Sequence, residues 1–234
     1  MESSPDRDAI VARALGLPPE LQSTSLLTWA GIAEVTKALR LPPGSLLVDA
    51  ACGRGGYGIE IARRTGARLL GVDFSAVALE QARRGGARRL PDGGPRFQVG
   101  SLTATGLADG VADGLMCVDA VQFAEPPLAA LTEFRRVLAP GARLAVTCWE
   151  AAGAGAPPRI RTVNLRRDLP AAGFTEARVD DRPGWREAER RMWQEVVEAP
   201  PGADAGMQSL QAEGRRSLDT FGSVRRVFAT ATAR

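Results

Sequence analysis

The sequence predicts an α/β fold built on a doubly wound parallel sheet. Short apolar runs such as Leu46-Leu47-Val48 alternate with segments whose apolar residues recur at helical spacing. Alternating strands and helices give a parallel sheet that helices cover on both faces, and right-handed crossovers wind it in two directions. A chain of 234 residues fits a single domain.

The elements follow one another along the chain with glycine or proline at most boundaries. We expect the first ten or so residues to be frayed, and Gly85 to Pro95 to form a loop. Strands are expected at 46–48, 67–72, 96–99, 115–118, 143–149, 175–181 and 224–232. Helices are expected at 26–39, 57–64, 77–84, 126–138, 165–172 and 185–198, with a last one ending near 221.

Composition excludes several classes of function. The chain has no histidine, which excludes a Ser-His-Asp triad, a histidine-ligated metal and a histidine base. Three cysteines and no long apolar run exclude a disulfide scaffold and a transmembrane protein. The net charge of +3 is spread along the chain, so no nucleic-acid partner is expected. Residues 1–8 are polar, and a reduced, cytoplasmic setting is expected.

A glycine-rich turn follows the first expected strand and opens the next helix. Gly53 to Gly58 fits the pattern G-x-G-x-x-G, and Asp73 lies 20 residues after Gly53, at the end of the second expected strand. Glycines let the backbone approach a ligand closely, and free amides at a helix N-terminus face that ligand. An acid at the position of Asp73 binds the ribose hydroxyls of an adenosine group. The pattern alone does not separate a dinucleotide from another adenosyl ligand.

Asp49 separates these two ligands better. It lies at the mouth of the first strand, where a pyrophosphate would pass. A carboxylate there repels pyrophosphate but suits a cation, and S-adenosylmethionine carries a sulfonium and an α-ammonium group. Two alternatives stay open. Asp49 could merely satisfy loop amides, and Asp73 could cap the next helix, although Ser75 could supply that cap instead.

Three segments resemble the class I S-adenosylmethionine-dependent methyltransferases. Leu47 to Gly56 is similar to the first motif of that family, Gly71 to Ser75 to its second-strand segment, and Arg135 to Leu144 to the turn before its fifth strand. The resemblance covers about residues 25 to 150. Within the family it points to small-molecule methyltransferases of actinobacterial natural-product pathways, which share the turn from Ala51 to Gly56 and a segment like 118–123.

The resemblance implies the architecture in more detail. It implies a Rossmann-like, doubly wound sheet of seven strands whose last strand, 224–232, is antiparallel and lies beside the fifth. A helical cap is implied at 1–40 and a cofactor-binding core at 41–150. The rest of the sheet would follow at 151–234, with a helical lid at about 185–221.

The resemblance also implies S-adenosylmethionine as cofactor and S-adenosylhomocysteine as product. By position, the methionine part would contact Asp49, Gly53, Gly55, the Val118 carbonyl and Gln122. The adenosine part would contact Asp73, Phe74, Ser101 and Leu102, and the expected set also includes Ala51, Tyr57 and Ser75. The chain departs from the family at Ser101, where many relatives have an aspartate, and a serine accepts a weaker hydrogen bond from adenine.

The substrate is expected over the carboxyl ends of the strands, covered by residues 22–29 and 185–221. Tryptophans could form an apolar wall there, although those at helical spacing could equally be core. Trp193 is expected in the core. Trp149, at the open end of the fifth strand, is the better pocket candidate, and the expected set is Trp29, Phe123, Trp149 and Trp185.

Methyl transfer is an in-line displacement at a sulfonium, and orientation and desolvation supply much of its catalysis. A phenol or amine must still lose a proton. The candidate bases are Glu150, Asp119, Tyr57 or an already ionised substrate, and Gln122 could position a polar group. We expect Glu150 to face the cavity with a pKa that burial raises, so Glu150→Gln should reduce turnover; a solvated loop carboxylate is the alternative. Carboxylates do not cluster at ligand spacing, so no metal is expected.

Two functions remain after this reasoning. The first is methyl transfer to an oxygen, nitrogen or carbon nucleophile of a small molecule, with a natural product as the expected partner. The alternative is a cyclase or pericyclase of the same fold that binds S-adenosylmethionine without transferring methyl. Asp49 disfavours a nicotinamide dehydrogenase. No membrane partner is expected, and a homodimer is compatible with the sequence.

Overall fold

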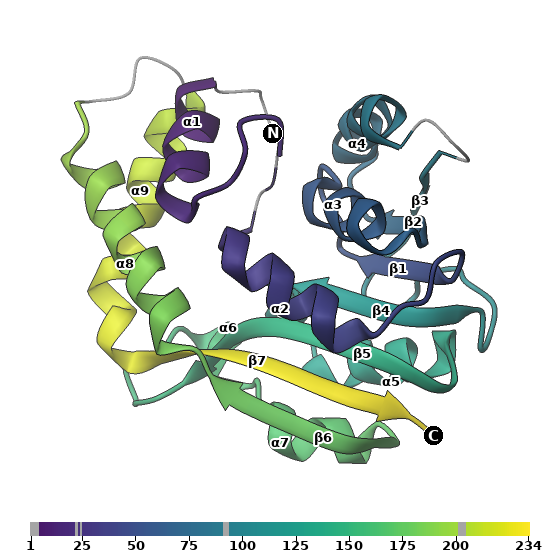
Figure 1. Cartoon of the computed structure of the whole chain (residues 1–234). Helices are drawn as coiled ribbons and strands as arrows, with labels where there is room; N and C mark the ends of the chain where they lie inside the picture. Colours follow the sequence, from purple (N-terminus) through teal and green to yellow (C-terminus); the bar gives the residue numbers. More distant parts are fainter. Residues whose placement is uncertain (1–4, 22, 24, 91–93, 201–204) are drawn as a thin grey trace.

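The computed structural model describes residues 5–21, 23, 25–90, 94–200 and 205–234. These residues form a sheet of seven strands in the order β3-β2-β1-β4-β5-β7-β6 (Figure 1). β7 is antiparallel to both β5 and β6, which confirms the expected position and direction of the last strand. The strands are β1 (Leu46–Ala50), β2 (Arg68–Asp73), β3 (Arg96–Val99), β4 (Ala112–Val118), β5 (Leu138–Ala151), β6 (Phe174–Asp181) and β7 (Val224–Ala233).

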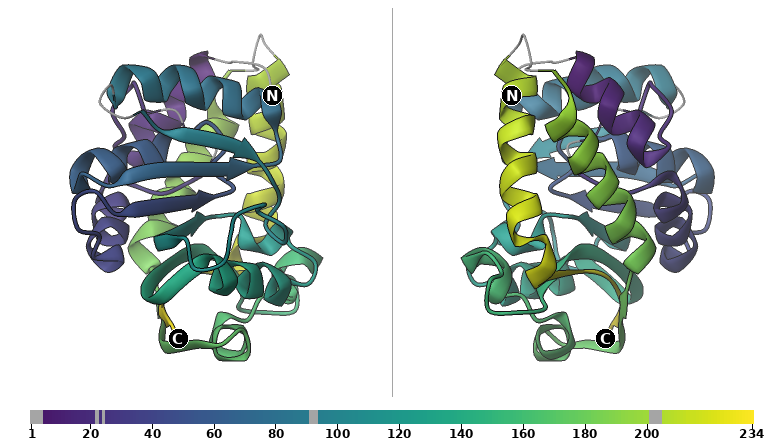
Figure 2. Two further views of the ribbon diagram at one scale, coloured as in Figure 1. Left: turned by 90° about the vertical axis from the view of Figure 1, so that its right-hand side faces the viewer. Right: turned by 90° about the vertical axis from the view of Figure 1, so that its left-hand side faces the viewer.

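Consecutive apolar residues bury both faces of the central strands. Leu47 and Met116 pack on one face, while Val48, Leu115 and Cys117 pack on the other. α2 (Trp29–Leu39), α3 (Gly56–Thr65) and α4 (Ala76–Arg89) cover the first face, and α5 (Pro127–Val137) and α7 (Leu165–Ala171) cover the second (Figure 2). The near-continuous apolar runs of the sequence are therefore those of a parallel sheet buried on both sides.

Three further helices lie at the edge where the parallel strands end. They are α1 (Pro5–Leu15), α8 (Pro183–Glu198) and α9 (Ala205–Thr220), and Figure 1 shows them side by side. The expectation of a frayed N-terminus is wrong from Pro5 onward, because Val11, Ala12 and Leu15 are buried against the other two helices. The isolated sequence could not show this, since α1 gains much of its apolar contact from α8 and α9, at the far end of the chain.

Several element boundaries also differ from expectation. α4 continues through Gly85 to Arg89, because Gly86 is buried and packs against Pro95 and Phe97. β5 begins at Leu138, five residues before the expected start at Arg143. The short helices α6 (Pro158–Arg161), η1 (Val121–Phe123) and η2 (Phe221–Ser223) were not expected. Residues 91–93 of the expected loop lie outside the described part of the chain.

Candidate functional site

The glycine-rich turn connects β1 to α3 and is held by the aspartate at the end of β2. Oδ2 of Asp73 accepts a hydrogen bond from the Gly53 N–H at 2.7 Å, and Oδ1 accepts from the Ser75 N–H at 2.9 Å. Gly55 has φ +76°, and a Cβ there would lie 3.1 Å from the side chain of Ala82. The sequence therefore needs glycine at this position, and Asp73 orders the turn from the neighbouring strand.

Asp49 lies beneath the first turn of α3 and is buried. A Cβ on Gly58 would lie 2.5 Å from Asp49 Oδ2, so only glycine lets the helix pass so close to this carboxylate. Burial and the neighbouring Asp73 raise the pKa of Asp49 well above its ordinary value. Two acids at the ends of adjacent strands disfavour a pyrophosphate and favour a cationic ligand.

The residues expected at the adenine lie next to Asp73. Phe74 is 81% exposed and offers an apolar face at the end of β2. Ser75 caps α4 by accepting a hydrogen bond from the Ala78 N–H at 3.2 Å, so the capping role that was left open for Asp73 belongs to Ser75. Ser101 is exposed in a β-bridge with Ala104, and Leu102 is half-buried.

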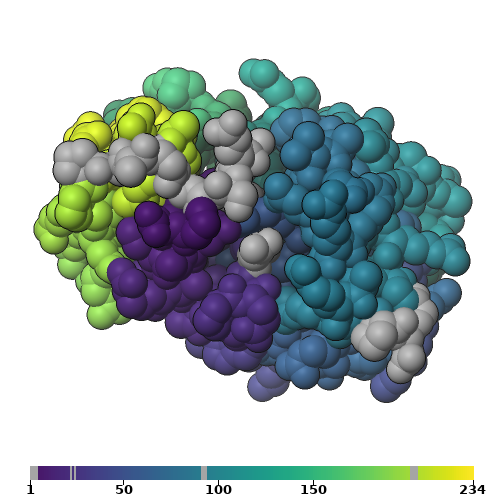
Figure 3. Space-filling model, turned by 90° about the horizontal axis from the view of Figure 1, so that it is seen from above, coloured from purple at the N-terminus to yellow at the C-terminus, as the bar shows by residue number. Residues whose placement is uncertain are grey.

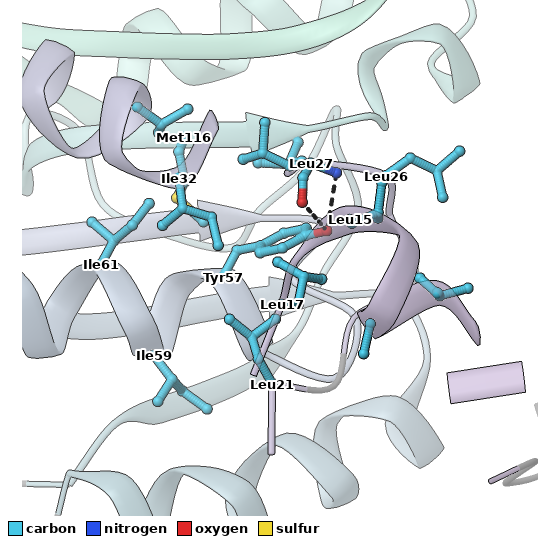
Figure 4. Packing of buried hydrophobic residues seen from close by; sticks show 14 of the residues in the cluster. Leu15, Leu17, Leu21, Leu26, Leu27, Ile32, Tyr57, Ile59, Ile61 and Met116 are labelled. Atoms are coloured by element: carbon cyan, nitrogen blue, oxygen red, sulfur yellow. Dashed lines mark hydrogen bonds between the residues drawn. The ribbon is translucent and has the colours of Figure 1, made fainter. Parts of the chain in front are cut away.

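Tyr57 fastens the segment that precedes α2. Its hydroxyl accepts a hydrogen bond from the Leu27 N–H at 3.0 Å (Figure 4). It also donates to the Ser25 carbonyl at 2.8 Å. Burial raises the pKa of Tyr57, which makes it unsuited to the role of base. Ser25 Oγ in turn donates to the Val118 carbonyl at 3.2 Å. The sequence did not predict that Tyr57 would hold this segment between the glycine-rich turn and the end of β4.

Asp119 follows β4, and protein groups contact both of its carboxylate oxygens. Its Oδ1 lies 2.6 Å from both Thr147 Oγ1 and Arg226 Nη2, and its Oδ2 accepts from the Leu26 N–H at 2.9 Å. Gln122 Nε2 donates to the Asp119 carbonyl at 2.6 Å. The expected role of Asp119 as a base is therefore not supported, because its carboxylate neutralises a fully buried arginine.

A cavity of about 750 Å³ opens beside Asp119. In Figure 3 the N-terminal residues, in purple, lie beside the yellow-green C-terminal helices on the face that is seen from above. The cavity lies between α1, α8, α9 and the ends of β4 and β5, as its lining residues show. The lining residues include Arg7, Val11, Ser25, Leu26, Asp119, Gln122, Phe123, Trp149, Arg159, Ile160, Glu189, Trp193, Glu213, Arg216, Asp219, Phe221 and Val224. Mixed apolar and polar walls of this size suit a small organic ligand.

The aromatic residues divide between the cavity and the core. Trp149 and Phe123 line the cavity, as expected. Trp185 does not; its Nε1 donates to Glu34 at 3.1 Å and its ring packs against Phe228. Trp29 does not line the cavity either and lies under the Arg64 guanidinium. These two pocket assignments are wrong, because helix rotation turns both rings toward α2, α3 and β7.

Trp193 was expected in the core, and it is both buried and part of the cavity wall. The interpretation of it as a core residue alone is therefore incomplete.

Glu150 lies on the opposite face of β5 from Trp149 and does not line the cavity. Its Oε1 accepts from the Leu165 N–H at 2.7 Å, and its Oε2 lies 2.6 Å from Arg225 Nη2. The expectation that Glu150 faces the cavity is wrong, since successive residues of a strand point to opposite faces. The carboxylate fastens the start of α7 to β7.

Sequence reasoning missed Glu189 and Arg226. Glu189 is 4% exposed and accepts hydrogen bonds from the indole N–H groups of Trp149 and Trp193. Arg226 lies opposite Trp149 in the register of β5 and β7, and its guanidinium carbon is 4.0 Å from the indole centroid. A usable signal was the spacing of Glu189 and Trp193, four residues apart on one helix face.

The described residues contain neither a cluster of metal-ligating side chains nor a helix that could span a membrane. Within them, no group of three or more histidine, cysteine, aspartate or glutamate side chains could hold a metal ion. None of their helices is long and apolar enough to cross a membrane.

Comparison with known proteins gives one family match. The model of a methyltransferase domain matches residues 48–146, a range that includes the glycine-rich turn, Asp73 and Asp119. An O-methyltransferase of Pyrenophora dematioidea is 29% identical over 125 residues, or 53% of this chain and 47% of that protein. The O-methyltransferase cnsE of Penicillium expansum is 27% identical over 158 residues, or 61% and 57%. The chain spans about half the length of these curated relatives.

Solved structures with the same fold cover nearly the whole chain. Phosphoethanolamine N-methyltransferase 2 of Haemonchus contortus, in complex with S-adenosyl-L-methionine, has a TM-score of 0.78 at 15% identity, over 98% of this chain and 57% of that one. The (4+2)-cyclase SpnF has a TM-score of 0.78 at 18% identity, over 96% and 92%. At these identities the likeness shows the fold, and it extends through the cap helices.

Proposed function

We propose that this chain, whose residues 48–146 match the model of a methyltransferase domain, binds S-adenosylmethionine and transfers its methyl group to a small molecule. The accepting atom is an oxygen, nitrogen or carbon, and S-adenosylhomocysteine is the product. The relatives named O-methyltransferase support this class of reaction, as does a family range that contains the whole glycine-rich turn.

One observation carries the proposal: the glycine-rich turn lies with two buried acids at the carboxyl ends of β1 and β2, and the segment that Tyr57 holds leads from this turn to the cavity. Asp49 and Asp73 end adjacent strands, β1 and β2. Ser25 and Leu26 line the cavity and belong to the segment that Tyr57 holds against α3. A cationic cofactor on the turn would therefore reach the cavity at the end of β4.

The proposed cofactor contacts follow from this arrangement. Asp73 keeps spare lone pairs for the ribose hydroxyls while it holds Gly53, because a carboxylate accepts about four hydrogen bonds. Phe74 offers a face for adenine, and Asp49 supplies negative charge beneath the methionine part. Asp49, Gly53, Gly55 and Val118 would line that part, with Gln122 at its end.

The reaction is an in-line displacement. The nucleophile forms a bond to the methyl carbon while the carbon–sulfur bond breaks, and its electron pair returns to sulfur. Orientation of the two reactants and exclusion of water supply most of the rate. The walls formed by Trp149, Phe221 and Val224 exclude water from the space where the substrate would lie.

Calorimetric titration with S-adenosylhomocysteine, run beside NADH, tests the cofactor. We expect S-adenosylhomocysteine to bind and NADH to give no heat of binding. Binding of NADH alone, or of neither ligand, would overturn the proposal. Transfer is tested separately with methyl-labelled S-adenosylmethionine and a panel of phenols and amines. Labelled product supports methyl transfer, whereas conversion of a substrate with the label left on the cofactor supports the cyclase alternative.

A further inference from the structure

We propose that Glu189 is the proton-accepting residue of the cavity and that the substrate is an apolar ring compound presenting a hydroxyl or amine N–H to it. The inference deepens the proposed function and rests on it for the methyl-transfer step. It replaces Glu150, which the fold places on the other face of β5.

The contacts of Glu189 leave part of its carboxylate available. Trp149 Nε1 lies 3.1 Å from Oε1 and 2.9 Å from Oε2, and Trp193 Nε1 lies 3.3 Å from Oε1. These two neutral donors fix the orientation of the carboxylate. Because each carboxylate oxygen accepts about two hydrogen bonds, Oε2 retains capacity for a further donor. Glu189 lines the cavity, so that donor can belong to a ligand.

The electrostatics of Glu189 differ from those of Asp119. Arg226 Nη2 lies 2.6 Å from Asp119 Oδ1, whereas Glu189 forms no ion pair with any residue that the structure describes. Burial raises the pKa of Glu189, and the charge of Arg226 opposes this only in part. Arg226, a buried cation, therefore lies behind the cavity wall against Trp149, while Asp119 and Glu189 line the cavity. The carboxylate without an ion-pair partner is the one suited to take a proton.

The rest of the cavity defines the ligand class. Its apolar lining includes Trp149, Trp193, Phe221 and Val224, and the indoles of the first two bind Glu189. Gln122 is buried in the same wall, and its Oε1 has no hydrogen-bond partner among the described residues. Glu189 and Gln122 can each accept a further hydrogen bond, so the ligand is expected to carry a hydrogen-bond donor. The other ionisable groups lining the cavity are Arg7 on α1, Glu213, Arg216 and Asp219 on α9, and Arg159 on α6.

The proton balance of the proposed step is simple. The substrate hydroxyl or amine passes its proton to the Glu189 carboxylate as its oxygen or nitrogen attacks the methyl carbon. The sulfonium becomes a neutral thioether, and the anionic carboxylate becomes a neutral acid, so charge is conserved. The protonated Glu189 then releases its proton to solvent when the methylated product leaves.

The test compares a phenol with its methyl ether, which lacks the O–H donor and carries one methyl group more. Equilibrium dialysis at neutral pH measures the affinity of 2-naphthol and of 2-methoxynaphthalene, each with and without saturating S-adenosylhomocysteine. We expect the wild-type chain to prefer 2-naphthol by about tenfold, the value of one charge-assisted hydrogen bond. Glu189→Gln should reduce this preference to about threefold or less, because a neutral acceptor forms a weaker bond. Glu187→Gln, an exposed change on the same helix, should keep it.

A second measurement does not depend on any ligand. Titration of Glu189 changes the hydrogen bonds of two indoles, so tryptophan fluorescence of the wild type should show a transition above the ordinary glutamate range. That transition should be absent in Glu189→Gln. Equal preference for 2-naphthol in both proteins, failure of 2-naphthol to bind the wild type, or the same fluorescence titration in both would overturn the inference. Failure of the proposed function shows separately, as absent binding of S-adenosylhomocysteine.

Discussion

At the scale of single residues, the position of Asp73 links the turn to the proposed cofactor. Its two oxygens hold the amides of Gly53 and Ser75, which fixes the carboxylate at the end of β2. A side chain held in this way loses little entropy when a ligand binds. The same carboxylate therefore stabilises the turn and is already held in place for the proposed ribose contact.

Asp73→Ala should weaken the binding of S-adenosylhomocysteine by about 1–3 kcal/mol, the cost of losing a charged hydrogen bond. Calorimetry measures the change, and circular dichroism checks that the variant is folded. Asp109→Ala removes an exposed carboxylate on the other side of β4 and should leave affinity unchanged. Unchanged affinity in a folded Asp73→Ala variant would contradict the ribose assignment.

Glu150→Gln has a different expected effect now that its contacts are known. It weakens the link to Arg225 and the hydrogen bond to Leu165, so the free energy of unfolding should fall by about 1–3 kcal/mol. Affinity for S-adenosylhomocysteine should not change. Urea unfolding measures the first quantity and calorimetry the second. Loss of turnover at full stability would restore Glu150 as the base.

At the scale of elements, α1 is held over the glycine-rich turn by one arginine. Arg54 forms two 2.7 Å contacts with the Asp8 carboxylate and donates to the Ser23 carbonyl at 3.0 Å. The pair is largely buried, and two-point contacts between arginine and carboxylate are the stronger kind. α1 also pairs with α8 through Arg13 and Glu195, but those two side chains are exposed. The turn and the cap are therefore coupled through Arg54.

Arg54→Ala should release α1 from the turn. We expect faster amide exchange across residues 5–21, by about tenfold or more, because the variant loses a half-buried ion pair of about 1–3 kcal/mol. Hydrogen exchange detected by mass spectrometry measures this. Arg13→Ala is the matched control and should change exchange little, since exposed pairs contribute about 0–1 kcal/mol. Equal exchange in both variants would show that Arg54 does not hold α1.

Glu133 on α5 gives the chain a pH-dependent contribution to stability. Arg136 and the N–H and hydroxyl of Thr105 bind its carboxylate and lower its pKa from 4.5 to about 2. A lowered pKa in the folded state means that the stabilisation is complete above pH 4.5 and is lost as pH falls toward about 2. Glu133→Gln should therefore be less stable at neutral pH, and its unfolding free energy should fall less between these values. Urea unfolding at several pH values checks this, and parallel curves for both proteins would contradict it.

At the scale of the whole molecule, β7 completes both the sheet and the cavity. It pairs with β5 and β6 on its two sides and carries Arg226 beneath Trp149. Asp119, which Arg226 neutralises, also holds Leu26 of the N-terminal segment. The two ends of the chain are thus joined at the site, and its charge balance depends on the last strand.

Removal of residues 224–234 should abolish cooperative folding. The truncation exposes the edges of β5 and β6 and leaves Asp119 without its cation, a loss of several kcal/mol. Differential scanning calorimetry should show no unfolding transition, whereas removal of Arg234 alone should leave the transition in place. A folded truncated chain that still binds S-adenosylhomocysteine would contradict this view of β7.

The sequence by itself determined the local features of this protein. The run from Val48 to Gly58 predicted a strand, a turn and a helix. Asp73 at the end of the next strand indicated the class of cofactor. Both predictions were possible because turns and strand ends depend on neighbouring residues. The resemblance predicted the antiparallel position of β7. Trp149 was predicted at the cavity because the strand expected from the sequence ends at this residue, and Trp149 does line the cavity.

Only the tertiary structure decided which acids and aromatic rings face the cavity. Glu150 and Trp149 are adjacent in sequence, and the pleat of β5 sends them to opposite faces. Trp185 and Glu189 lie on one face of α8, one turn apart, and they differ in the element that each meets: Trp185 packs against Glu34 of α2, whereas Glu189 lines the cavity. Arg226 and Asp119 meet across 107 positions of sequence. Contacts of this kind follow from how elements pack, and no spacing within one element encodes them.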